Sequence, residues 1–149
     1  MSLPPRAAPP GDCPRRIPPS NDRLNNGKQA MVYDSDNIFA KILRGEIPCD
    51  KVYEDDHVLA FNDINPLAPT HVLVVPKDAY VSMDDFTQNA SDTAISALFR
   101  AAGQIARDLG LGDGGYRILA NTGDDGGQEV PHLHIHIFGG RPLGPMLLR

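Results

Sequence analysis

Three of the five histidines in this 149-residue chain stand at alternate positions near its C-terminal end, as His132, His134 and His136. Apolar residues fill the positions between them, and such strict alternation predicts a half-buried β-strand over residues 131–138. Alternate side chains of a strand lie on one face, roughly 6.5–7 Å apart. The three imidazoles would then form a polar, titratable row where packing alone favours Val or Ile. Two kinds of site suit this row: a metal site, or an anion site with one histidine as nucleophile or acid–base group.

The segments on both sides of the row help to choose between a metal site and an anion site. It is preceded by Asn121, a glycine-rich stretch at residues 123–127, and Gln128. It is followed by Gly-Gly-Arg-Pro-Leu-Gly-Pro-Met at residues 139–146. The pattern His-φ-His-φ-His-φ-φ, in which φ is apolar, together with these flanks resembles the histidine triad (HIT) superfamily, and in particular the bacterial form of its Hint branch. The resemblance covers residues 36–146.

The resemblance implies a hydrolase for purine nucleoside 5′-phosphoramidates, such as AMP joined through a P–N bond to an amine or lysine. It makes His134, the middle histidine, the nucleophile that forms a nucleotidyl-histidine intermediate. It assigns His132 and His136 to orienting His134 and binding the phosphate oxygens. Gln128 and backbone N–H groups would hold the developing charge, and His71 would back the three histidines. This chemistry requires no metal and no other cofactor.

The same resemblance implies where a purine nucleotide binds. Asp63, at the end of a predicted strand, matches the residue that accepts hydrogen bonds from the ribose, and Ile64 matches an apolar contact of the base. Glu129 stands where eukaryotic relatives have Ser; its carboxylate either holds a cationic leaving group or is a solvated loop residue. The nucleotide-binding residues implied in full are Phe39, Ile47, Phe61, Asp63, Ile64, Asn121, Gly127, Gln128, Glu129, His134 and His136.

Three other functions stay open at this point. The first is hydrolysis of dinucleoside polyphosphates, the activity of a sister branch, although the Gly-Gly pair at residues 139–140 argues against it. The second is a non-catalytic sensor or scaffold that only binds a purine nucleotide. The third is a zinc carrier, because neutral imidazoles are good zinc ligands.

Composition limits the class of protein further. The length suits a single domain, and a hydrophobic content of 41% is enough for an ordinary core. The formal net charge of −5 argues against binding to nucleic-acid backbones. No apolar run reaches the roughly 18 residues that a membrane span needs. Of the two cysteines, Cys13 lies in a proline-rich segment and Cys49 does not, which fits a reducing compartment better than a disulfide framework. We therefore expect a cytoplasmic protein without nucleic-acid or membrane partners.

Residues 1–30 differ from the rest of the chain. Seven of the fourteen prolines lie in the first twenty residues, and the segment carries five basic residues against two acidic ones. Because no apolar period runs through it, we expect a disordered or polyproline-like arm, followed by a HIT domain at residues 31–149. An upstream start codon or a vector-derived extension explains this arm better than a transit peptide does.

Hydrophobic periodicity and capping residues predict the elements that must position these side chains. A short helix should begin after a cap at Ser35 or Asp36 and end at Gly45. A long helix should begin at Ser91 or Asp92 and end near residue 110. Further strands are predicted at residues 51–54, 58–62, 72–75 and 116–121, a polar connection at residues 77–90, and an irregular loop at residues 123–127.

This order of elements predicts an α+β fold, with helices on one face of a mainly antiparallel sheet. The resemblance implies more detail: a HIT-like fold with a five-stranded sheet per subunit, one long and one short helix, and a two-fold homodimer with a continuous ten-stranded sheet. Exposed sheet edges also favour a homodimer, because an unpaired edge strand is an aggregation liability.

Overall fold

The computed structural model describes residues 32–148, so the predicted arm at residues 1–30 lies outside the described residues. In chain order the elements are α1 (Ile38–Leu43), β1 (Lys51–Glu54), β2 (Val58–Asn62), β3 (Thr70–Pro76), α2 (Met83–Asn89), α3 (Asp92–Asp108), β4 (Tyr116–Leu119), α4 (Gly123–Gly126) and β5 (Ile135–Gly139). The first two predicted strands are confirmed residue for residue, the third is longer than predicted, and the fourth ends two residues earlier. Over this described part, no helix combines the length and apolar character that crossing a membrane requires.

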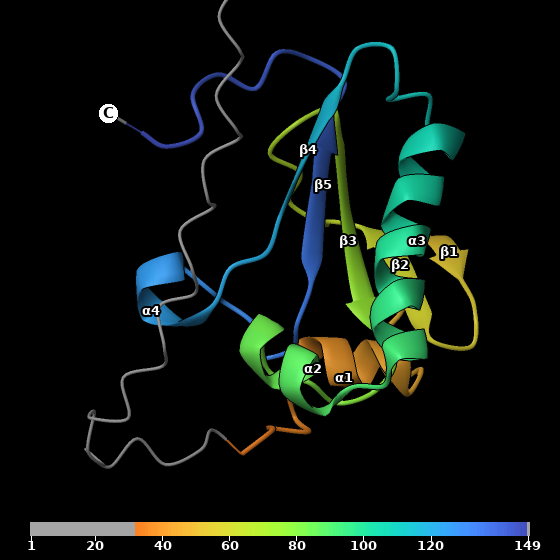
Figure 1. Ribbon diagram of the computed structural model, residues 1–149, viewed down its shortest axis with the longest axis vertical. Coiled ribbons are helices and arrows are strands. Elements are labelled where there is room, and N and C mark those ends of the chain that lie inside the picture. Colours follow the sequence, from red (N-terminus) through yellow and green to blue (C-terminus); the bar gives the residue numbers. More distant parts are fainter. Residues whose placement is uncertain (1–31, 149) are drawn as a thin grey trace, which may run out of the picture. The chain divides into compact units, whose positions relative to one another are not determined.

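The five strands form one sheet in the order β1-β2-β3-β5-β4, and every neighbouring pair is antiparallel. The last strand of the chain, β5, therefore lies between β3 and β4 (Figure 1). The predicted α+β class with a five-stranded antiparallel sheet is confirmed. This topology brings the C-terminal histidines next to β3, where Leu73 is the register partner of His136 and His71 that of Phe138.

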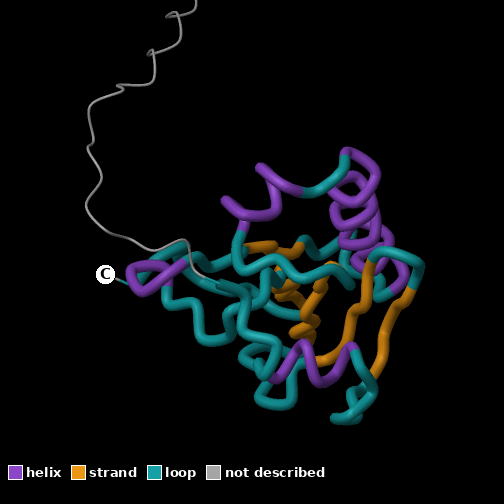
Figure 2. The backbone as a smooth tube through the Cα atoms, turned by 90° about the horizontal axis from the view of Figure 1, so that it is seen from below, coloured by secondary structure: helices purple, strands orange, loops and turns teal. Residues whose placement is uncertain are grey.

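Both faces of the sheet are buried at its centre. Alternate residues of β2 and β3 belong to two apolar clusters, one shared with α3 and one with α1. Val58, Ala60, Val72 and Val74 face α3, whereas Leu59, Phe61, Leu73 and Val75 face α1. Figure 2 accordingly shows helical segments on both sides of the strands. The prediction that the helices share one face is wrong, and the unbroken apolar runs of these strands fit burial on two sides.

The long helix follows the prediction closely. The hydroxyl group of Ser91 accepts a hydrogen bond from the backbone N–H of Ala94 at 3.1 Å and caps α3. Gly110, with a φ of +70°, follows the last turn in the left-handed region that suits glycine.

The cap of α1 lies later than predicted. Asn37, rather than Ser35 or Asp36, accepts the N–H of Ala40 at 2.9 Å through its side-chain oxygen. Its side-chain amide also donates to the carbonyl group of Asp34 at 2.7 Å. Asn37 is buried, and these two hydrogen bonds satisfy both ends of its amide within the protein. They therefore fix the start of α1.

Two short helices were not predicted. Residues 77–90, expected to be a polar connection, contain α2, which is capped by Ser82 and buries Phe86 completely. The expected loop at residues 123–127 contains α4, a single turn that ends at Gly127 with a φ of +72°. The prediction of one long and one short helix is therefore incomplete. Apolar periodicity could not identify these helices, because α2 buries only one residue and α4 buries none.

The strand that carries the histidines is shorter than predicted. β5 pairs with β3 only from the pair Val74 and Ile135 onward, so residues 131–134 lie outside the sheet. Continued pairing would run past Pro76, which has no N–H to donate. The N–H of Leu133 instead donates to the carbonyl group of Tyr80 at 2.7 Å. The predicted row of three histidines on one strand is therefore wrong, because only the last of them belongs to β5.

Candidate active site

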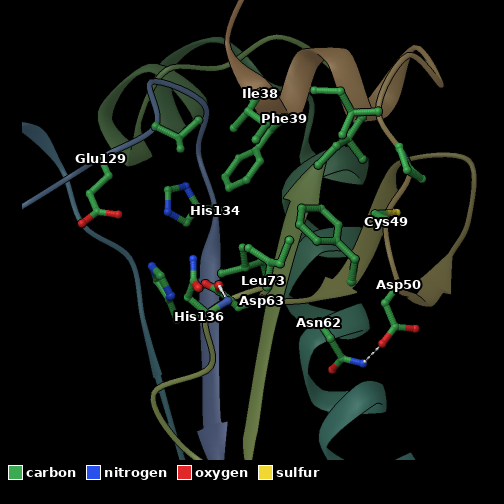
Figure 3. Close-up of a pocket in the computed structure, with 17 residues that line it drawn as sticks. Ile38, Phe39, Cys49, Asp50, Asn62, Asp63, Leu73, Glu129, His134 and His136 are labelled. Carbon is green, nitrogen blue, oxygen red and sulfur yellow. Dashed lines mark hydrogen bonds between the residues drawn. The ribbon is translucent and has the colours of Figure 1, made fainter.

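An open pocket lies on the α1 side of the sheet, with a cavity volume of about 580 Å³. This volume falls within the range of roughly 300–1,000 Å³ that is usual for small-molecule sites. Eight predicted site residues line it: Phe39, Ile47, Phe61, Asp63, Ile64, Glu129, His134 and His136. Figure 3 labels five of them around the pocket, namely Phe39, Asp63, Glu129, His134 and His136. The apolar residues come from α1, the chain after it, β2 and the loop after β2. His136 belongs to β5, and His134 lies just before that strand.

His134 faces the pocket with one fixed tautomer. Its Nδ1 lies 2.7 Å from the carbonyl oxygen of His132, which can only accept a hydrogen bond. The hydrogen of neutral His134 is therefore on Nδ1, and Nε2 keeps its lone pair. Phe39 packs edge-on against the imidazole, with ring centroids 5.0 Å apart. A nucleophilic histidine requires this arrangement of a bonded Nδ1–H and an exposed Nε2 lone pair.

His136 presents the opposite kind of nitrogen. The backbone N–H of Leu67 donates to Nδ1 of His71 at 3.1 Å, so neutral His71 carries its hydrogen on Nε2. That Nε2 lies 2.9 Å from Nδ1 of His136, which must accept. His136 is then left with its hydrogen on Nε2, a buried atom that has no hydrogen-bond partner in the described chain. A buried N–H of this kind at the edge of a pocket is suited to donating to a ligand oxygen.

His132 does not line the pocket, but its backbone carbonyl group is the hydrogen-bond partner of His134. It is fully buried, and its Nε2 donates to the carbonyl group of Pro76 at 2.9 Å. Its Nδ1 therefore accepts, and the hydroxyl group of Tyr33 donates to it at 2.5 Å. With both nitrogens occupied, the ring of His132 is unavailable to a ligand, whereas its backbone carbonyl orients His134.

Burial keeps all four histidines neutral near pH 7. It lowers the pKa of His132 and that of His136 to about 4 in each case. It also lowers the pKa of His134 and that of His71 below the ordinary value for histidine. For His134 the hydrogen bond to the backbone carbonyl and two nearby carboxylates act in the opposite direction, against the burial effect. A neutral His134 has the lone pair that attack on phosphorus requires.

Asp63 and Ile64 lie in the loop after β2. One carboxylate oxygen of Asp63 accepts the N–H of Asn65 at 2.8 Å, and the other lies 3.4 Å from Nε2 of His71. The side chain of Ile64 is 92% exposed, although it borders the pocket. Asp63 therefore lies at the pocket beside His136 (Figure 3), and its carboxylate is also close to His71.

The structure does not bring Gln128, Asn121 and Gly127 to the lining of this pocket. The side-chain amide of Gln128 donates to the carbonyl groups of Val81 and Val130, at 2.6 and 3.0 Å. Its side-chain oxygen accepts the N–H of Gly123 at 3.1 Å. Gln128 thus ties the α4 turn to the chain before α2 and has no amide hydrogen left for a phosphate.

Several lining residues were missed from the sequence. They include Ile38 and Ile42 of α1, Leu73 of β3, and Cys49 and Val130 in connections. The alternation of β3 could have identified Leu73, since it shares a face with Phe61 across the β2 pair. Tyr33 was also missed as the partner of His132, because no local pattern links two residues so far apart in the chain.

A metal site can be considered at one cluster. Asp63, His71 and His136 offer atoms that lie within 4.8 Å of one another. However, Nδ1 of His71 accepts the N–H of Leu67, and its Nε2 is bonded to Nδ1 of His136. A metal would have to replace both hydrogen bonds of His71, so the contacts favour a chain of hydrogen-bonded imidazoles over a metal centre.

Known proteins resemble this chain in sequence and in structure. A model of the HIT domain family matches residues 44–143. A HIT-like protein of 13.2 kDa from Azospirillum brasilense is 62% identical over 120 residues, which are 80% of this chain and 98% of the relative. Purine nucleoside phosphoramidase of Escherichia coli strain K12 is 47% identical over 112 residues, covering 75% of this chain and 93% of the enzyme.

Two solved structures give the same result. A histidine triad protein from Clostridium difficile has a TM-score of 0.69 and 47% identity, over 78% of this chain and all of the other. A HIT family hydrolase from Legionella pneumophila has a TM-score of 0.68 and 40% identity, over 72% and 95% of the two chains. The similarity therefore extends over nearly the whole length of each relative.

Proposed function

The chain belongs to the HIT domain family, and from this membership we propose that it is a hydrolase that cleaves the P–N bond of purine nucleoside 5′-phosphoramidates. The observation that carries the proposal is the pair of Nε2 atoms at the pocket. That of His134 keeps a lone pair, and that of His136 carries a buried hydrogen without a partner in the described chain. A nucleophile and a hydrogen-bond donor placed together suit attack on a phosphoryl group. The relative from Escherichia coli supports the substrate class by its name.

In the proposed reaction, Nε2 of His134 attacks the α-phosphorus, an N–P bond forms, and the P–N bond to the amine breaks. The departing nitrogen takes a proton from solvent water at the open side of the pocket. A second water molecule then attacks phosphorus, the bond to His134 breaks, and the nucleoside monophosphate leaves. The proton that this water releases balances the one taken up by the amine, so each turnover consumes one water.

The remaining pocket residues are suited to binding the nucleoside part of such a substrate. Phe39, Ile47 and Phe61 give an apolar wall for a purine base, with Ile64 at its exposed edge. Asp63 would accept hydrogen bonds from the ribose hydroxyl groups. Three predicted residues lie outside the pocket lining, namely Asn121, Gly127 and Gln128. Any contribution from them to nucleotide binding would come through the α4 turn.

Substitution of His134 is the most direct test. His134→Ala should lower kcat by several orders of magnitude, because it removes the attacking atom, while AMP binding is largely retained. With a slowly cleaved AMP amide, the unmodified protein should gain the mass of one AMP on the peptide that contains His134. The matched control is His57→Ala, since His57 lies in the turn between β1 and β2, away from the pocket. Near-normal turnover by His134→Ala would contradict the covalent mechanism.

The proposal includes a cytoplasmic homodimer. The support within the described chain is β4, an edge strand of the sheet on which Tyr116 and Ile118 are 45% and 44% exposed. Pairing of two such edges would cover these side chains and extend the sheet to ten strands.

A further inference from the structure

The charge of the pocket is unusual for a site that binds phosphate. Among the described residues that line it there are three carboxylates, from Asp50, Asp63 and Glu129, and neither Lys nor Arg. The imidazoles do not offset this charge, because burial lowers the pKa of His134 and that of His136 and keeps both rings neutral at pH 7. A phosphate that enters the pocket therefore meets neutral hydrogen-bond donors inside a field of negative sign.

The three carboxylates differ in position and in contacts. Asp50 accepts a hydrogen bond from the side chain of Asn62 at 2.8 Å, on the side of the pocket away from the histidines (Figure 3). Asp63 is held by Asn65 and lies next to His71, as described above. In contrast, no hydrogen bond or ion pair joins the Glu129 carboxylate to another residue of the described chain.

Glu129 also lies on the side of the pocket where a leaving group would depart. Figure 3 shows it next to His134, across from the apolar residues of α1. A base stacked on those residues would leave the other substituent of phosphorus directed toward the loop that carries Glu129. The negative charge of Glu129 is close enough to act on the pKa of His134, raising it against the larger effect of burial.

We propose that Glu129 is a specificity-determining residue that selects leaving groups with a positive charge of their own, such as the free ammonium group of a diamine. This inference rests on the proposed phosphoramidate hydrolysis and adds the charge of the leaving group to it. A cationic leaving group offsets the carboxylates and offers Glu129 the partner that the described chain does not supply. A polyphosphate leaving group would bring further negative charge into the same field, so dinucleoside polyphosphates should be poor substrates.

Two matched substrates test the proposal. One is the AMP amide of an alkylamine, and the other is the AMP amide of a diamine of equal length, which places an ammonium group at the far end. The ratio of their kcat/KM values should favour the diamine by roughly three- to tenfold, a modest range because Glu129 is exposed to solvent. The ratio should fall as the salt concentration rises, because salt screens exposed charges.

Substitution assigns the preference to one side chain. Glu129→Gln should bring the ratio close to one, and Glu129→Lys should reverse the preference in favour of an amide that ends in a carboxylate. Asp125→Asn is the matched control, since it removes one negative charge from the same segment but lies outside the pocket lining, and it should keep the preference of the unmodified protein.

The outcomes separate this inference from the proposed function. Turnover of both amides at equal kcat/KM, or an unchanged ratio in Glu129→Gln, would overturn the role of Glu129 and leave phosphoramidate hydrolysis standing. Failure to cleave either amide, with efficient cleavage of dinucleoside polyphosphates, would overturn the proposed function and the inference together.

Discussion

At the scale of single residues, the site is defined by where each histidine carries its hydrogen. Four residues have the same imidazole side chain, yet their hydrogen bonds leave different ring nitrogens as donors and acceptors: His71, His132, His134 and His136. A backbone carbonyl holds the hydrogen of His134 on Nδ1. A backbone N–H begins the series of hydrogen bonds that leaves a donor on Nε2 of His136. Both fixed points belong to the main chain, so they are independent of pH over the range in which the protein is folded.

Substitution of Asp63 gives a prediction that separates substrate binding from the chemical step. Asp63→Ala should raise KM more than it lowers kcat, because a group that holds the ribose stabilises the substrate and the transition state alike. Steady-state kinetics on an AMP amide give both constants. Asp63→Asn should lie between Asp63→Ala and the unmodified protein, since an amide still accepts a hydrogen bond. An equal fall in kcat and kcat/KM would instead assign Asp63 to the chemical step through His71, whose Nε2 lies 3.4 Å away.

The buried histidines predict how stability depends on pH. The pKa of His132 and that of His136 are lowered to about 4, whereas an unfolded histidine titrates near 6.5. Above pH 6.5 neither state binds these protons, and stability is fully present. As the pH falls from about 6.5 to about 4, the unfolded chain takes up protons that the folded protein does not, so the free energy of unfolding should decrease. Urea unfolding at a series of pH values measures this slope.

His132 separates this effect from general acid denaturation. His132→Gln should lower stability at pH 7, because the contacts with Tyr33 and Pro76 change, but it should reduce the slope between about pH 6.5 and 4. His57→Gln serves as the control and should keep the slope of the unmodified protein. A slope that is unaltered in His132→Gln would show that other groups cause the pH dependence.

At the scale of elements, the turn after β5 fixes the strand against the loop before β3. Gly140 has a φ of +92°, and a Cβ at this position would lie 2.8 Å from Cβ of Pro69 and 3.6 Å from the backbone nitrogen of Thr70. Pro69 is rigid and cannot move aside as a long side chain would. The same loop begins with Asp63, so this close approach connects the end of β5 to the pocket.

Gly140→Ala should therefore be more harmful than other glycine substitutions. We expect a loss of about 1–3 kcal/mol from the positive φ together with the steric clash. Gly144→Ala is the matched control, because Gly144 has a φ of +78° but no atom within 4 Å of the place that a Cβ would occupy. Its loss should be only about 1 kcal/mol, from the backbone conformation alone. Chemical denaturation measures both values, and equal losses would mean that contact with Pro69 is not what requires glycine.

The segment around α4 shows how an element can serve a site that it does not line. Gln128 uses both amide hydrogens and its oxygen to join this turn to Val81 and Val130. The two residues that follow it, Glu129 and Val130, do line the pocket. Gln128 thus holds the chain next to Glu129 in this structure, and its contact with phosphate stays a prediction of the family resemblance.

At the scale of the whole molecule, the exposed edge of β4 predicts a homodimer. Ile118 is the register partner of Ile137, which belongs to the cluster under α3, so it extends that apolar face to the edge of the sheet. Ile118→Lys should convert a dimer into a monomer, because it places a charge in the middle of the edge that would be paired. Light scattering at micromolar concentrations measures the mass of each form. Val32→Lys, which replaces an exposed apolar residue outside the sheet, should remain dimeric.

The sequence by itself determined the elements whose signals are local. The strands at residues 51–54 and 58–62 follow from apolar runs bounded by turn residues, and the start of α3 follows from the cap at Ser91. The spacing of the histidines and their flanks also identified the family and eight residues of the pocket lining. Each of these depends on neighbours within a few positions, so a pattern in the chain contains the information.

Tertiary structure decided the features that depend on distant partners. The face on which α1 packs, the departure of residues 131–134 from the sheet, and the tautomer of each histidine follow from contacts across the fold. His132 is hydrogen-bonded to Pro76, which is 56 positions away, and to Tyr33, which is 99 positions away. The alternating pattern of the histidines predicted a strand because apolar periodicity reports which side chains can be buried. It does not report which backbone groups remain available for pairing, and Pro76 ended the ladder at that point.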